Sequence, residues 1–218
     1  MASEIADVLE QTDLGSFIYR HRSIFVTLVV LILLIFGSYA TYSYFQEKKH
    51  QEYDELIYSF HKVNLPETEL DSQNSKQSTV KMENLDNFNS EKAYKAFKDL
   101  SHKTGDYKGL YPVSIELSDA LYQKGDIEKS IKTLEMTKST VESPLMQYIH
   151  ATRLAVYYEE TGKIKKAISE LEDLIRNSVK LMEGKTYLDL GRLYLAEGKN
   201  ESALKNFDYV LKHTSDND

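Results

Sequence analysis

One long apolar run stands near the N-terminus of a chain whose other segments mix apolar and polar positions. From Ile24 to Phe45 the sequence contains no Asp, Glu, Lys, Arg or His. A helix over these residues spans about 33 Å, which is enough to cross a hydrocarbon core of about 30 Å. It also satisfies its own backbone hydrogen bonds, which lipid cannot do. We therefore predict an N-terminal tail over 1–23 and a transmembrane helix over 24–45.

A cleaved signal peptide is the competing interpretation of this run. The Ser-Tyr-Ala sequence at 38–40 is a small-x-small pattern of the kind found at cleavage sites. Against cleavage, the preceding tail is long and net acidic, and the run exceeds the roughly 7–15 residues usual for such a signal. The orientation stays open on the sequence, because Arg20 and Arg22 before the run are balanced by Lys48 and Lys49 after it.

Apolar residues at helical spacing continue after the run and then stop. Those over 53–60 predict a juxtamembrane helix over 46–63. The segment 64–89 is rich in Ser, Asn, Gln and acidic residues without a sustained apolar period, which predicts a flexible linker. Ser90 is the predicted N-cap of the next helix.

A pattern with a period of 36 to 37 residues occupies the rest of the chain. Gly125, Gly162 and Gly198 are 37 and 36 residues apart, and each follows an apolar helical stretch. Self-similarity at this period is typical of a solenoid built from pairs of helices. The last unit resembles the tetratricopeptide pattern almost in full, with Tyr187, Leu190, Gly191, Tyr194, Gly198, Ala203, Phe207 and Val210 in the expected order.

The two preceding units repeat this order less completely, with Ala151, Leu154, Ala155, Tyr158, Gly162, Ala167, Leu171 and Leu174 in the middle unit and Ser114, Leu117, Ser118, Leu121, Gly125, Ser130, Leu134 and Thr137 in the first. Small residues fall where paired helices must approach closely, and glycine supplies the left-handed conformation that ends the first helix of each pair. We therefore predict an all-α fold: an N-terminal transmembrane helix followed by a tetratricopeptide-like α-solenoid of about three repeats within 90–218. A generic helical bundle with accidental spacing is the alternative.

The resemblance to tetratricopeptide proteins also predicts a binding surface. In those proteins the first helix of each pair lines a concave groove, which suits an extended segment or a helix of a partner protein. The predicted protein-binding groove consists of Asp119, Tyr122, Thr152, Val156, Glu159, Leu188, Arg192 and Leu195, with Ile115 as a further candidate. Packing between repeats is an equally good interpretation of Ile115, Val156 and Leu188. The edge formed by Leu204, Tyr209 and Leu211 is a second candidate surface, for a partner, a second copy or the Ser90 helix.

Composition and motifs give no sign of catalysis or of a cofactor. The chain has no Cys, which excludes disulfides, thiolate zinc sites and cysteine nucleophiles. Its six His show no metal-ligand spacing, and phosphate-loop, GxGxxG and GxSxG motifs are absent. A net charge of −7 offers no concentrated basic surface for nucleic acid. We expect a protein that binds other proteins, with no cofactor, metal, nucleic-acid partner or enzymatic activity.

The order of parts along the chain carries a second resemblance. An acidic tail and the stretch Phe17-Ile18-Tyr19-Arg20-His21-Arg22 lead into one membrane helix, which is followed by a juxtamembrane helix, Ala93-Tyr94 and degenerate repeats. This layout resembles the YfgM-like ancillary subunit of the bacterial Sec translocon. The resemblance implies a single-pass protein of the bacterial inner membrane, with a cytoplasmic N-terminus and a periplasmic repeat domain. It also implies a scaffold that associates with the Sec translocon, periplasmic chaperones or secreted clients. An N-anchored receptor or assembly factor, with cytosolic repeats that bind targeting segments, is the alternative.

Overall fold

A computed structural model of the protein describes residues 20–66, 85–177 and 179–214. Within these ranges the chain is helical and contains no strand, which confirms the predicted all-α class. The α-helices are α3 (Arg22–Asn64), α4 (Ser90–Thr104), α5 (Leu110–Gln123), α6 (Ile127–Thr137), α7 (Pro144–Glu160), α8 (Ile164–Arg176), α9 (Glu183–Ala196) and α10 (Asn200–Thr214). Two short 3-10 helices, η1 (Leu85–Asn87) and η2 (Lys138–Thr140), complete the described secondary structure.

The chain divides into two compact units, Met1–Glu52 and Tyr53–Asp218. In the first unit, the apolar part of α3 is long and apolar enough to cross a membrane, and its side chains are exposed along the whole span. Two of its hydroxyl groups are satisfied within the helix, since Thr27 and Thr41 donate hydrogen bonds to the carbonyls four residues earlier, at 2.7 and 2.8 Å. A long, exposed and apolar helix of this kind is compatible with a membrane anchor.

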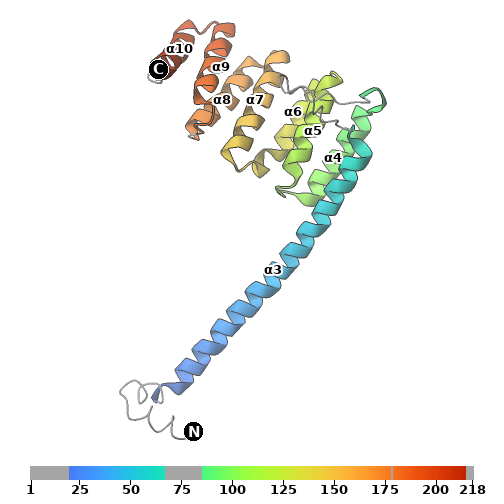
Figure 1. Cartoon of the computed structure of the whole chain (residues 1–218), viewed down its shortest axis with the longest axis vertical. Coiled ribbons are helices and arrows are strands. Elements are labelled where there is room, and N and C mark those ends of the chain that lie inside the picture. The colour runs from blue at the N-terminus through green and yellow to red at the C-terminus, as the bar shows by residue number, and fades with distance from the viewer. Residues whose placement is uncertain (1–19, 67–84, 178, 215–218) are drawn as a thin grey trace, which may run out of the picture. The chain divides into compact units, whose positions relative to one another are not determined.

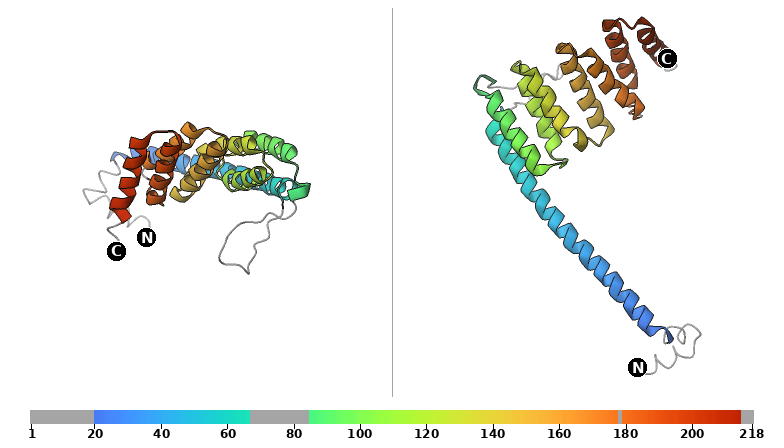
Figure 2. Two further views of the ribbon diagram at one scale, coloured as in Figure 1. Left: turned by 90° about the horizontal axis from the view of Figure 1, so that it is seen from above. Right: turned by 180° about the vertical axis from the view of Figure 1, so that it is seen from behind.

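Three helix pairs form the predicted solenoid, which we call the array: α5 with α6, α7 with α8, and α9 with α10. The first member of each pair (α5, α7, α9) is an A helix and the second (α6, α8, α10) is a B helix. Figure 1 shows the six helices side by side in chain order, and Figure 2 shows the same order from two other sides. This arrangement confirms the prediction of about three tetratricopeptide-like repeats.

The three glycines of the repeat have the same role in each pair. Gly125, Gly162 and Gly198 have φ values of 82°, 72° and 76°, in the left-handed region that side chains with a Cβ disfavour. Each glycine N–H donates to the carbonyl three residues earlier, and the next N–H donates to the carbonyl five residues earlier, with N···O distances of 2.7 to 2.9 Å. These bonds satisfy the last carbonyls of the A helix and turn the chain into the B helix, as predicted.

Small residues line the contact between the A and B helices. Ser118, Ser130, Ala167 and Ala203 have no exposed surface. At Gly191, an added Cβ atom would overlap the ring of Phe207, so a small residue favours the close approach of the two helices there. The predicted role of the small positions is therefore confirmed.

The second unit begins inside α3, and the last turns of that helix belong to its core. Phe60 is 6% exposed and lies in a cluster with Phe97, Leu100 and Leu117, against which Leu56 and Ile57 also pack. The sequence predicts a juxtamembrane helix for this stretch but not its burial under α4 and α5. An isolated apolar stripe does not reveal which surface will cover it.

The segment between α3 and α4 is described only in part. Of the predicted linker 64–89, residues 67–84 lie outside the described residues, whereas Leu65 and Phe88 pack against the cluster around Phe97. The predicted N-cap is wrong by one residue. Asn89 caps α4, because its side-chain oxygen accepts a hydrogen bond from the Lys92 N–H at 2.9 Å and Ser90 is already helical.

Candidate functional site

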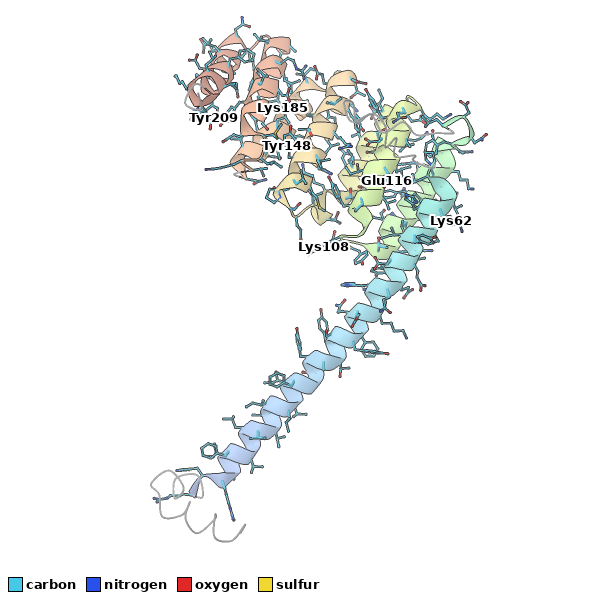
Figure 3. All side chains as sticks on the ribbon, viewed as in Figure 1. Lys62, Lys108, Glu116, Tyr148, Lys185 and Tyr209 are labelled. Atoms are coloured by element: carbon cyan, nitrogen blue, oxygen red, sulfur yellow. The ribbon has the colours of Figure 1, made fainter. Side chains whose placement is uncertain are left out.

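The predicted groove residues lie on the three A helices. Asp119 and Tyr122 are on α5, Thr152, Val156 and Glu159 are on α7, and Leu188, Arg192 and Leu195 are on α9. We call the surface formed by these residues the A-helix face. Figure 3 shows Glu116 of α5, Tyr148 of α7 and Lys185 of α9 following one another along the array. The charged and the apolar members of this face have different roles.

A polar link joins α5 to α7. The Arg153 guanidinium donates to both carboxylate oxygens of Asp119, with N···O distances of 2.9 Å each, and the Tyr157 hydroxyl donates to the same carboxylate at 3.0 Å. The Tyr122 ring stacks on that of Tyr157, with centroids 4.8 Å apart, and its hydroxyl donates to Glu160. Two of the predicted binding residues therefore contact neighbouring helices of the array itself.

The burial of Tyr157 and Asp119's negative charge both raise the pKa of the Tyr157 phenol above its ordinary value. The hydrogen bond to Glu160 likewise raises the pKa of Tyr122. Both phenols therefore stay protonated near neutral pH and act as donors toward carboxylates. Bidentate Arg–carboxylate pairing adds geometric definition to this junction.

A second polar link joins α7 to α9. The Arg192 guanidinium pairs with both carboxylate oxygens of Glu159, and the Nη2–Oε2 distance is 2.8 Å. This hydrogen bond lowers the pKa of Glu159. The Arg192 side chain is about half exposed, so the pair fixes the spacing of the helices more than it stabilises the fold.

The apolar members of the A-helix face remain accessible. The exposed fractions are 44% for Val156, 50% for Leu188 and 50% for Leu195. Ile115, in contrast, packs against the core of the array. Thr152 donates its hydroxyl hydrogen bond to the Tyr148 carbonyl at 2.7 Å, which uses the hydroxyl within its own helix.

Sequence reasoning missed four residues in or next to this face. Arg153, Tyr157 and Glu160 complete the polar link, and Leu145, seven residues before Thr152 on α7, is 56% exposed. A sequence signal for the links does exist. Opposite charges occur 33 or 34 residues apart at Asp119 and Arg153 and again at Glu159 and Arg192, which is close to one repeat period.

A small hollow lies at the junction of the first and second repeats. It has a volume of about 150 Å³ and is lined by Lys138, Val141, Gln147, His150, Ala151, Glu170, Asp173, Leu174 and Asn177. His150 is 3% exposed, and neither of its ring nitrogens makes a hydrogen bond within the described residues. Burial, together with the nearby Lys138 cation, lowers the pKa of His150 to about 4. The imidazole is therefore neutral near pH 7.

A second hollow, of about 400 Å³, lies between α8, α9 and α10 and is lined by Glu172, Ile175, Arg176, Tyr187, Leu190, Tyr194 and Asn206. The Tyr194 hydroxyl donates to Glu172 across it. Among the described residues, no group of three or more His, Cys, Asp or Glu side chains is arranged to hold a metal ion.

Comparison with protein families matches residues 17–104 to the family described as "Sigma factor regulator N-terminal". The match covers less than half of the chain and includes α3 and α4. A search of curated proteins gives no significant match.

Solved structures similar to this chain contain tetratricopeptide-like repeats. A Podosopora anserina protein, described as a kinesin light chain with nearly identical TPR-like repeats, is 16% identical with a TM-score of 0.47, over 59% of this chain and 68% of that one. A structure of MamA is 20% identical with a TM-score of 0.45, over 58% and 70% of the two chains. A structure titled MamA AMB-1 is 14% identical with a TM-score of 0.42, over 75% and 84%.

Proposed function

We propose that the chain is a membrane-tethered scaffold that binds another polypeptide on its A-helix face. The observation that carries the proposal is that the charged and the apolar side chains of this face are in different states. Its charged groups are paired with one another across the repeats, whereas Val156, Leu188 and Leu195 are left exposed. When a partner removes exposed apolar side chains such as these from water, the free energy falls and binding is favoured.

The chemistry of the face favours an apolar helix or an extended apolar segment as the ligand. The charged groups are already neutralised by their neighbours on α5, α7 and α9, so a partner gains little from opposing charges. Leu188 and Leu195 are seven residues apart on α9, which is about two helical turns and matches the spacing of apolar residues on an amphipathic helix. The scaffold is proposed to act without catalysis.

A membrane anchor would affect where this binding takes place. An anchor over 24–45 would confine the array to the membrane surface and raise the effective concentration of its partners there. Following the resemblance to the translocon subunit, we place the array in the periplasm of a bacterial inner-membrane protein. Its partners would be the Sec translocon, periplasmic chaperones or secreted clients.

The proposal is tested by site-specific photo-cross-linking in the full-length protein. A photoreactive residue at Leu188 should give cross-links to a partner, whereas one at Leu204, which is 63% exposed on a B helix, should give few. Leu188→Asp should abolish capture while leaving the circular dichroism spectrum unchanged, because the side chain is already half in water. Equal cross-linking at both positions would contradict the assignment of the A-helix face.

Regulation of a sigma factor is a second candidate function, favoured by the family match over residues 17–104. In this case the partner is cytosolic. Protease added to spheroplasts separates the candidates: digestion of the array supports the periplasmic scaffold. Protection of the array supports a cytosolic role, either as a sigma factor regulator or as a receptor for targeting segments. Cross-links from residues within 17–104 to a sigma factor then select the regulator.

A further inference from the structure

Helix α4 carries the same pattern as the three B helices. Its Ala93 lies 37 residues before Ser130, which lies 37 before Ala167, which lies 36 before Ala203. The larger apolar residue four positions later is Phe97 in α4, and the equivalents in the B helices are Leu134, Leu171 and Phe207. Ala93 and Phe97 are 2% and 0% exposed, as expected for the buried face of a B helix.

The neighbours of α4 also follow the repeat. It packs against α5, just as α6 packs against α7 and α8 packs against α9. Gly105 follows α4 with a φ of 58°, and five residues separate α4 from α5, close to the six that separate each of the next two B helices from the following A helix. Helix α4 thus occupies the place of a B helix in front of the first repeat.

The last turns of α3 occupy the place of the missing A helix. The ring of Phe60 meets that of Phe97 edge to face, with centroids 5.8 Å apart and planes at 63°. Leu56 and Ile57 pack against the same cluster, which includes Leu117 of α5. Helix α4 keeps the small residue of a B helix as Ala93, and its contact with α3 is made by this edge-to-face pair of aromatic rings.

Polar links tie this stretch to the α5 region, as they tie the A helices to one another. His61 Nε2 lies 2.7 Å from Oε2 of Glu116, a residue of α5 that is labelled in Figure 3. The Tyr107 hydroxyl donates to Asp54 at 2.7 Å, which raises the pKa of Tyr107 to about 12, and the rings of Tyr53 and Tyr107 lie 5.4 Å apart. The series of links between α5, α7 and α9 therefore continues onto α3.

We propose that the end of α3 (residues 53–64) and α4 form a fourth, degenerate repeat that caps the array. Terminal repeats of solenoids are atypical in sequence because they must close the core. Here the closing helix is continuous with the apolar run, so the helix that carries the anchor also stabilises the first repeat. The family match ends at Thr104, the last residue of α4, and so covers this repeat together with the apolar run.

Hydrogen exchange of the full-length protein in lipid nanodiscs tests this capping role. Phe60→Ala removes the ring that covers Phe97, and the amides of α4 and α5 should then exchange at least about tenfold faster. The amides of α9 and α10 should be little affected, since solenoid repeats stabilise only their neighbours. Tyr58→Ala is the matched control, because Tyr58 is on the same helix and 69% exposed. Phe60→Leu should restore most of the protection.

Unchanged exchange in α4 and α5 after Phe60→Ala would overturn the proposal. A loss of protection throughout the chain would also support it, provided that Tyr58→Ala is unaffected, because the array would then depend wholly on its cap. The result is independent of partner binding: photo-cross-linking from Leu188 reports on the A-helix face, whichever way the exchange experiment turns out.

Discussion

The two terminal layers of the repeat array share a sequence pattern but differ in burial. Helix α4 has Ala93 and Phe97, and α10 has Ala203 and Phe207 at the same spacing. Phe97 is fully buried under the end of α3, whereas Phe207 is only half-buried and its neighbour Leu204 is 63% exposed. The pattern places both rings on the inner face of a helix, but the exposed area of each ring depends on whether another helix packs over it.

The largest loss of stability is expected for a substitution in α4, where the aromatic ring is fully buried. Phe97→Ala should lower the free energy of unfolding by about 3–5 kcal/mol, since it removes a buried ring and leaves a cavity. Phe207→Ala should lower it by clearly less. Chemical denaturation of the two variants in detergent micelles measures both values. If the two losses were equal, burial would not distinguish the two ends.

The junction between the first and second repeats should show the next largest effect, as acid sensitivity. Unfolded His150 binds a proton below about pH 6.5, but folded His150 does so only below about pH 4, so stability is lost as the pH falls through this window. At pH 5 the loss is about 2 kcal/mol.

The measurement is the difference between wild type and His150→Phe in denaturation at pH 7 and pH 5. Lys138 of η2, Tyr111 of α5, and Glu170 and Asp173 of α8 surround this site and are present in both proteins. The variant should therefore lose less stability on acidification. Parallel losses in the two proteins would show that other groups cause the acid sensitivity.

A smaller effect is expected inside the last repeat. Gly191→Ala places a methyl group against the Phe207 ring and should cost about 1–2 kcal/mol. The half-buried ring can move partly aside, which keeps the loss moderate. Gly184→Ala on the same helix has nothing within 4 Å of its new methyl group and should instead stabilise the protein, by about 0.5–1 kcal/mol. Thermal unfolding of both variants separates packing from helix propensity.

The smallest effect is expected on the exposed side of α10. Leu204→Ser should change stability by less than about 0.5 kcal/mol, since surface substitutions of this kind rarely do more. A stability loss of the size predicted for Gly191→Ala would mean that another molecule or segment covers this surface. Measuring this stability loss at two protein concentrations would then distinguish self-association from burial of Leu204 by a segment of the same chain.

The sequence predicts local backbone geometry better than burial by distant segments. The turns at Gly125, Gly162 and Gly198 could be predicted, because a left-handed turn depends on a single residue and its immediate neighbours. The burial of Phe60 could not be predicted in the same way, because its partner Phe97 is 37 residues away and belongs to a different helix. The same limit applies to the burial of His150, because its surroundings depend on η2 and α8 and on Tyr111 of α5.

The candidate site shows this limit in a more specific form. Helical spacing groups Asp119, Glu159 and Arg192 with Val156, Leu188 and Leu195, and all six residues lie on the A helices. It cannot tell whether a charged side chain points to a partner or to the next repeat. Only the positions of Arg153 and Glu159 in the fold show that these charges are paired within the protein.

The links between successive A helices have a mechanical consequence. Each link joins one helix only to the next, so the link between α7 and α9 can open while the one between α5 and α7 stays closed. The curvature of the array can thus change at one joint at a time. The α7–α9 joint is the more solvent-exposed, so raised ionic strength should soften it first.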